Sequence, residues 1–147
     1  MSASALAADI KPALVTSVGP DLDLEAAMPG IAVHNTPSSD TTTFRNSYHN
    51  GIRTQVLTGI GASITSSDIP REWYSAPLVL LGPLVGEVSY ELAQAFPHAM
   101  TLASIQGWLR GWNDAGLITA ANWGGEEVLP YVDAAIVSTH DVEDWRL

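Results

Sequence analysis

The sequence predicts an α/β fold, and two features of its pattern support this expectation. Short apolar runs alternate along the chain with segments of helical periodicity, as in sheets whose neighbouring strands are parallel. In addition, Asn50-Gly51 separates two segments of alternating character, which predicts a projecting β-hairpin. The length of 147 residues, with 46% hydrophobic and 15% charged residues, is that of one globular domain. We therefore expect a single domain over 1–147.

The strands of the sheet are predicted from apolar runs that end in turn residues. These runs are 13–18, 31–34, 78–81, 100–105 and 134–137. All except the short run at 31–34 have the composition of buried strands. One helix is expected to begin at Ser67 or Asp68, and another to span 87–96 before Pro97.

The hairpin is predicted over 41–57, because Asn50 and Gly51 both tolerate the positive φ of a two-residue type I′ turn. This turn fixes the register by pairing His49 with Ile52. Side chains alternate between faces with period two, so one face should collect an aromatic ring, two amides and a guanidinium. These four residues, which we call the polar face, are Asn46, Tyr48, Arg53 and Gln55.

The polar face has two interpretations. On a hairpin taken alone, it is an ordinary solvated surface that needs no ligand. In a binding protein, the same groups suit a small sugar or polyol, because they stack on it and hydrogen-bond its hydroxyls in both directions. Both interpretations stay open at this point.

Composition excludes several classes of function. The formal net charge of -10 opposes nucleic-acid binding, and Lys11, the single lysine, lies in no P-loop motif. Without cysteine, the chain has no disulfide, thiolate metal site or cysteine nucleophile, and the histidines lack metal-ligand spacing. No run is long enough to span a bilayer, and 1–8 lacks the basic start of a signal peptide. We expect a soluble cytoplasmic protein that binds neither nucleic acid nor membrane.

Two more groups of polar residues follow predicted strands, at the edge where α/β sheets bind ligands. Ser138 and Asp141 have the spacing of a helix cap, and the same groups could instead hold phosphate or the water shell of Mg²⁺. Gln106 and Arg110 follow the run at 100–105, and the arginine suits a carboxylate, phosphate or diol. The neighbouring Trp108 and Trp112 are interpreted first as packing residues.

In their order and separation, these motifs resemble the middle of a PfkB-type (ribokinase-like) carbohydrate kinase. The resemblance covers most of the chain. It rests on the segments 14–21, 41–46 with Tyr48 and 53–55, 68–70 with Trp73, 80–83, 106–110 and 138–142. The implied fold is a partial ribokinase-like, Rossmann-type sheet with helices and a projecting hairpin lid.

The resemblance also implies roles for individual residues. A lid built from strands at about 31–34 and 41–57 would close over the sugar, with the polar face toward the substrate. Ser138 and Asp141 match the positions of the family's Asn-x-x-Glu motif, which helps to place Mg²⁺ and phosphate, although both residues differ from it. Gln106 and Arg110 fall where some members contact the sugar or an acid group. No direct metal ligand is assigned.

Parts of the family pattern are missing from the sequence. The amino-terminal Gly-Gly substrate motif is not present, and neither is the Gly-Ala-Gly-Asp motif that supplies the catalytic base and anion hole. The base is therefore expected beyond Leu147. Complete members use ATP and Mg²⁺, and we expect this chain to bind neither tightly.

Three functions follow from the resemblance. The first is part of an ATP-dependent sugar kinase that is inactive as an isolated chain. The second is a non-catalytic carbohydrate-binding or interaction module with the same fold, and the third is a truncated product without a function of its own. Lid strands in this family sometimes pair between subunits, so a homodimer through the hairpin is also possible.

Overall fold

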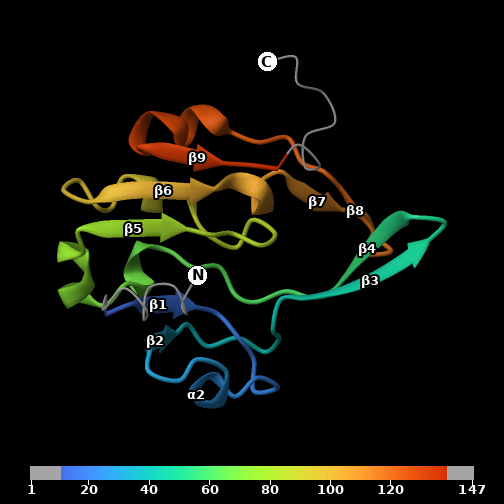
Figure 1. Cartoon of the computed structure of the whole chain (residues 1–147), viewed down its shortest axis with the longest axis horizontal. Helices are drawn as coiled ribbons and strands as arrows, with labels where there is room; N and C mark the ends of the chain where they lie inside the picture. Colours follow the sequence, from blue (N-terminus) through green and yellow to red (C-terminus); the bar gives the residue numbers. More distant parts are fainter. Residues whose placement is uncertain (1–10, 139–147) are drawn as a thin grey trace.

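Parallel strands form the body of the molecule, which a computed structural model describes over residues 11–138 (Figure 1). β5 (Leu78–Leu81) pairs with β6 (Met100–Ser104), and β6 pairs with β9 (Ala134–Ile136), all in parallel. Beside them, β1 (Ala13–Thr16) and β2 (Ala32–Asn35) form a second parallel pair. Each apolar run that predicted a strand contains one, which confirms the α/β fold.

The position of β2 corrects one expectation. Residues 31–34 are expected beside the hairpin as a lid strand, but within 11–138 the pairing partner of β2 is β1, with Leu14 opposite Val33. The side chain of Asn35 also accepts a hydrogen bond from the Val18 N–H at 2.9 Å and donates one to the Val18 carbonyl at 3.2 Å. The crossover between the two strands contains the short helix α2 (Leu24–Ala27), whose first N–H groups are capped by Asp23. This crossover holds β2 in the body.

The hairpin has the predicted turn and register. β3 (Thr43–His49) pairs antiparallel with β4 (Ile52–Gly59), and the turn residues Asn50 and Gly51 have φ angles of 51° and 79°. His49 lies opposite Ile52, as a two-residue type I′ turn requires. In Figure 1 the hairpin projects from the side toward which the arrowheads of β5, β6 and β9 point. It therefore stands at the carboxyl ends of the parallel strands, where α/β sheets bind ligands.

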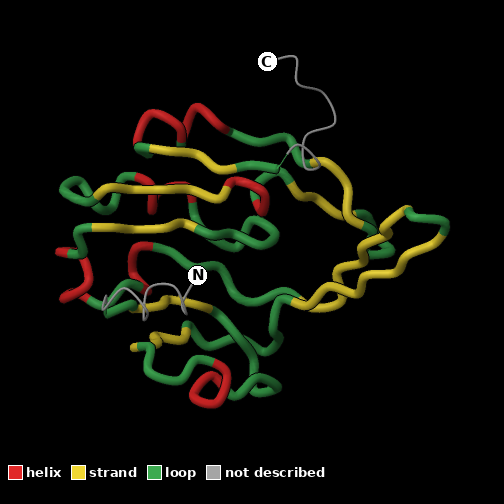
Figure 2. Tube along the Cα trace, in the orientation of Figure 1, coloured by secondary structure: helices red, strands yellow, loops and turns green. Residues whose placement is uncertain are grey.

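The helical segments are short, and none spans the helix predicted over 87–96 (Figure 2). Apart from α2, the helical turns over 11–138 are 3-10 segments: η1 (Ser66–Asp68), η2 (Arg71–Ser75), η3 (Tyr90–Ala93), η4 (Ile105–Gly107), η5 (Gly125–Glu127) and η6 (Leu129–Tyr131). The prediction of a helix over 87–96 is wrong, because the only helical segment in this range is the short 3-10 turn η3. The Ile64 N–H donates a hydrogen bond to the Glu87 carbonyl, and the Ser89 N–H donates one to the Ile64 carbonyl. Because these backbone groups are already paired with another segment, the helical hydrogen bonds begin only at Tyr90.

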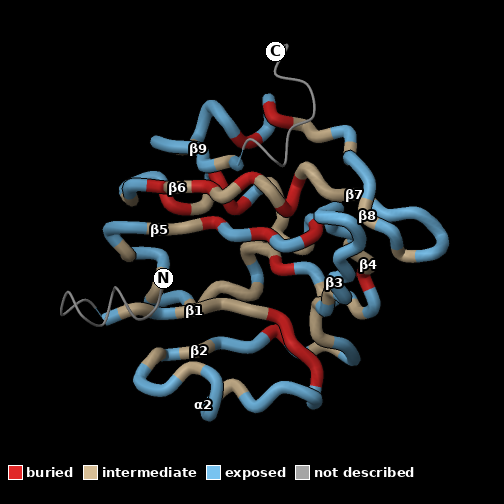
Figure 3. The backbone as a smooth tube through the Cα atoms, turned by 45° about the vertical axis from the view of Figure 1, so that its right-hand side comes forward, coloured by how far each residue is buried: buried red, intermediate tan, exposed pale blue. Residues whose placement is uncertain are grey.

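One face of the three-stranded sheet carries the core, and Figure 3 shows how burial differs between strands. Leu81 and Ala103 point into this core, with Trp108 and Val128 packed below them. The strand predicted as buried at 134–137 is instead exposed along the whole of β9. The apolar composition of a strand does not determine which segment covers it, so the burial of β9 could not be predicted from its sequence.

The opposite face of the sheet, which we call the outer face, is apolar and largely open. The pairing places Leu78 beside Met100 and Leu80 beside Leu102, with Ala134 next in line. Leu78 is 52% exposed, Met100 57% and Ile136 54%. Parallel sheets are normally covered on both faces. These exposed side chains show that, within the described residues, no layer covers this face.

No helix within the described residues is both long enough and apolar enough to cross a membrane.

Candidate functional site

The root of the hairpin is fastened to the end of β1. The Gly19 N–H donates to Thr41 Oγ1 at 3.0 Å, and the Thr41 hydroxyl donates to the Asp21 carboxylate at 2.5 Å. On the other strand, the Gly61 N–H donates to Thr42 Oγ1 at 2.9 Å. A Cβ on Gly61 would lie 2.5 Å from the Ser17 carbonyl, so only glycine allows this close approach. These contacts fix where the hairpin leaves the body.

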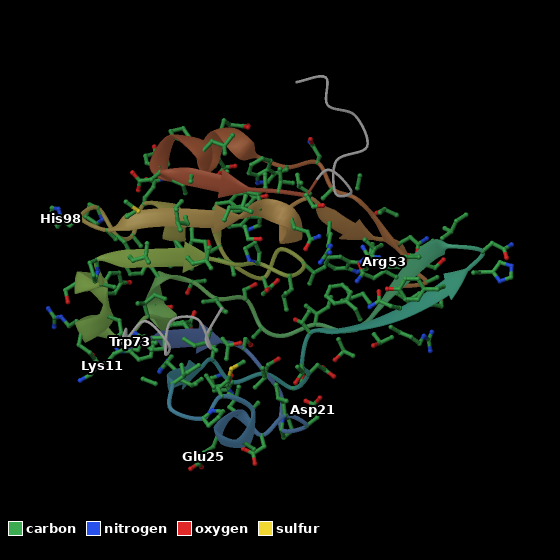
Figure 4. All side chains as sticks on the ribbon, in the orientation of Figure 1. Lys11, Asp21, Glu25, Arg53, Trp73 and His98 are labelled. Carbon is green, nitrogen blue, oxygen red and sulfur yellow. The ribbon has the colours of Figure 1, made fainter. Side chains whose placement is uncertain are left out.

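The polar face lies on one side of the hairpin, as the register predicts. Tyr48 pairs with Arg53 and Asn46 with Gln55. Three of these side chains are exposed, Tyr48 by 72%, while Gln55 is half-buried. Arg53 lies on the projecting hairpin, on the other side of the molecule from Trp73 and His98 (Figure 4). The polar face is thus brought together, and its role in binding stays a prediction.

Arg110 extends the polar face toward the body. It begins β7 (Arg110–Trp112), and its guanidinium carbon lies 5.4 Å from the centre of the Phe44 ring, a cation–π geometry. Phe44 shares the face of Asn46 and Tyr48, because these residues alternate along β3. The same guanidinium donates from Nη1 to the Leu84 carbonyl at 3.1 Å. Arg110 therefore connects the root of the hairpin to the loop after β5.

The loop after β5 is held by one carboxylate. Glu87 accepts hydrogen bonds from the N–H groups of Leu84 and Val85, each at 2.8 Å. A Cβ on Gly107 of η4 would collide with the backbone of Pro83, so the ends of β5 and β6 meet closely. Gln106, next to this glycine, is half-buried and already has an interaction partner. It lies at the expected strand end, and its role in substrate binding stays a prediction.

The phosphate and metal expectations are only partly placed. Ser138 is exposed just after β9 and has an interaction partner, whereas Asp141 lies outside the described residues. Within 11–138, no three histidine, aspartate or glutamate side chains gather closely enough to hold a metal ion. The role of Ser138 and Asp141 beside phosphate or Mg²⁺ therefore stays a prediction.

Two carboxylates with lowered pKa values serve the fold. The Thr65 N–H bonds to Asp68 at 2.8 Å, and this bond lowers the pKa of the Asp68 carboxyl below 3.8. The Ser66 N–H donates to Glu91 at 2.8 Å and lowers its pKa in the same way. Thr65, and not Ser67 or Asp68, caps η1, and Asp68 completes its capping box. Both carboxylates thus hold η1 in place.

Sequence reasoning missed the part of the site formed by β7 and β8 (Ile118–Ala120). Trp108 packs in the core as expected, at 3% exposure, with its indole N–H bonded to the Val88 carbonyl at 2.8 Å. Trp112 does not pack in the core and is 46% exposed. The turn between β7 and β8 touches β4, where the Leu57 N–H donates to the Gly116 carbonyl at 2.8 Å. Local pattern holds no signal for this contact between distant segments.

The chain matches no protein-family model and no curated protein. Among solved structures, it is similar to a pyrophosphate-dependent kinase in the ribokinase family, determined as a sulfate complex. The TM-score is 0.77 at 22% sequence identity, and the alignment covers 95% of this chain and 51% of the kinase. The chain thus has a ribokinase-like fold and spans about half the length of that relative. The likeness establishes the fold, not the substrate or the donor.

Proposed function

We propose that this chain is the acceptor-binding part of a PfkB-type carbohydrate kinase, with the polar face as the surface that binds a small sugar or polyol. The observation that carries the proposal is the placement of the polar face, which stands at the carboxyl ends of the parallel strands and continues into Arg110. A kinase acts on its acceptor by positioning one hydroxyl in line with the phosphoryl group. A fixed root and an exposed hydrogen-bonding face suit this task.

The phosphoryl donor of the complete protein is a separate question. ATP with Mg²⁺ follows from the resemblance to PfkB-type kinases, whereas the similar solved structure is of a pyrophosphate-dependent kinase. We propose ATP as the donor, with Ser138 and Asp141 near the phosphate and metal, and pyrophosphate is the alternative to test beside it. In either case the chain's own contribution is to bind and orient the acceptor.

The competing proposal is a non-catalytic carbohydrate-binding module with the same fold. It uses the same polar face, so sugar binding alone does not separate the two. DNA sequence on both sides of the coding region does separate them. A downstream in-frame segment that encodes Gly-Ala-Gly-Asp favours the kinase, because this motif would supply the base and anion hole.

The test of the acceptor surface compares two arginines on the hairpin. Arg53 belongs to the polar face, whereas Arg45 pairs with Val56 and points to the opposite face. We expect Arg53→Ala to weaken binding of the preferred sugar about tenfold or more, the usual effect of losing hydrogen bonds to a charged group. Arg45→Ala, which removes the same charge from β3 on the opposite face of the hairpin, should leave affinity unchanged.

Saturation-transfer NMR and calorimetry, with hexoses, pentoses and ketosugar acids, measure these affinities. Equal affinities for both variants would show that the polar face does not bind the sugar. We further propose that the protein is cytoplasmic and binds neither nucleic acid nor membrane. We also propose that it forms a homodimer through the unpaired edges of the hairpin strands.

A further inference from the structure

A hollow of about 460 Å³ lies beside the root of the hairpin, and the proposed function does not use it. Its walls come from two segments, 57–60 at the end of β4 and 112–116 at the turn between β7 and β8. The volume suffices for one ring-sized group.

The walls of this hollow are held in place by hydrogen bonds. Asn113 Oδ1 accepts from the N–H groups of Ala115 at 3.1 Å and Leu117 at 3.0 Å, and the Gly116 N–H donates to the Asn113 carbonyl at 2.8 Å. Gly116 has a φ of +74°, and a Cβ there would lie 2.5 Å from the Leu57 carbonyl. A ligand would therefore meet a preformed site, with little ordering cost on binding.

The lining offers an aromatic surface and a free carboxylate. Trp112 is 46% exposed, which is high for a residue that usually buries most of its indole. Asp114 is exposed and has no hydrogen-bond or ion-pair partner among residues 11–138. An indole stacks on the flat or apolar side of a ring, and a carboxylate accepts hydrogen bonds from hydroxyl, amide or amino groups at its edge.

The hollow adjoins the polar face. Leu57 lines the hollow and also sits opposite Phe44, at the inner end of the polar face. Trp112 and Arg110 lie on the same side of β7, since they are two residues apart, and Arg110 stands over Phe44. A sugar on the polar face would thus have the hollow beside it.

We propose that the hollow binds a second ring, linked to the sugar on the polar face and carrying hydrogen-bond donors at its edge. The proposal rests on the acceptor function proposed above, and makes the preferred acceptor a two-ring compound instead of a free monosaccharide. Stacking and a carboxylate recognise two sources of such a ring, a nucleobase or a second sugar. The shared chemistry is a stackable ring with edge donors.

The experiment measures affinity by saturation-transfer NMR and calorimetry for three groups of compounds: free monosaccharides, disaccharides and nucleosides. We expect one two-ring group to bind about fivefold or more tightly than the monosaccharides, because a stacked ring contributes on this scale. Trp112→Ala and Asp114→Asn should each reduce this preference, while monosaccharide affinity stays unchanged. Glu126→Gln, which removes an exposed carboxylate of η5, is the control.

The outcomes separate this proposal from the acceptor function. If Arg53→Ala weakens every ligand but Trp112→Ala changes none, the polar face binds sugar and the hollow does not bind a second ring. If the affinity for two-ring compounds depends on Trp112 but not on Arg53, the hollow binds a ring and the polar face does not bind the sugar. Binding of no compound overturns both. Trp112→Phe keeps an aromatic ring and should retain part of the preference, which excludes unfolding as the cause.

Discussion

Gly51 and Asn50 show how single residues set the geometry of the site. Both have positive φ at the hairpin tip, and this turn decides which side chains share the polar face. A β-branched residue with positive φ is strained, because its side chain collides with its own backbone.

We expect Gly51→Val to lower the free energy of unfolding by about 1 kcal/mol or more. The matched control is Gly82→Val, since Gly82 has no positive φ and nothing within 4 Å of an added Cβ. Thermal and urea unfolding, followed by circular dichroism, measure the difference. Equal stability of the two variants would contradict the turn type.

Asp68 gives the stability of η1 a pH dependence. Its folded pKa lies below 3.8, chiefly because its carboxylate accepts the Thr65 N–H. Stabilisation is therefore complete above the unfolded pKa and is lost as pH falls through the lower folded pKa. Asp68→Asn should be less stable than the wild type at pH 7, and this difference should shrink below about pH 4. A constant difference from pH 7 to pH 3 would show that the carboxylate charge is not involved.

At the scale of elements, the contact of the β7–β8 turn with β4 builds the hollow. Val56 and Leu117 form an isolated antiparallel bridge, next to the bond from Leu57 to Gly116. Glycine is required at this point for two reasons, its φ of +74° and its closeness to the Leu57 carbonyl.

We expect Gly116→Ala to separate the turn from β4 and to cost more than 1 kcal/mol, the approximate cost of positive φ in an alanine. Gly86→Ala is the control, because Gly86 has a φ of +85° but open space around an added Cβ. Hydrogen exchange of the Leu57 amide should accelerate only in Gly116→Ala. Similar exchange in both variants would mean that positive φ alone, and not the contact, is responsible.

The elements predicted well are those whose cause is local. Asn50-Gly51 determines its hairpin with neighbours in sequence, and short apolar runs mark the five parallel strands, whereas β7 and β8 carry no such run. The helix expected over 87–96 failed because Ile64, far away along the chain, takes the backbone of Glu87 and Ser89. The predicted burial of Trp112 and of β9 was wrong for a related reason, since periodicity does not reveal which segment covers a side chain. The polar face followed from register, while Arg110 over Phe44 needed the tertiary structure.

At the scale of the whole molecule, the outer face of the sheet exposes Leu78, Met100 and Ile136. An open apolar sheet favours association. We expect the purified chain to bind a hydrophobic dye and to self-associate with rising concentration. The double change Met100→Gln and Ile136→Gln should reduce both effects, whereas Leu22→Gln, at a residue 40% exposed on a loop, should not. Light scattering and dye fluorescence measure this, and no difference among the three proteins would contradict it.

We also expect no measurable phosphoryl transfer by the 147-residue chain. A missing base typically costs about a hundred- to ten-thousandfold in rate, and a missing anion hole a further hundredfold or more. A coupled assay should detect neither ADP release from ATP nor phosphate release from pyrophosphate, over hexoses, pentoses, ketosugar acids and nucleosides. Clear sugar-dependent release of either product would contradict this expectation.

The wide sequence separation of the parallel strands has a consequence for the order of folding. β3 and β4 are joined by two residues, and such hairpins close within about 1–10 μs. β9 begins at Ala134, so its pairing with β6 must wait for a long loop to close, which slows folding. We therefore expect the hairpin to form while the sheet is still unfinished. In pulsed hydrogen exchange during refolding, the amides of β3 and β4 should become protected before those of β9, and each new chain would display the polar face before its body is assembled.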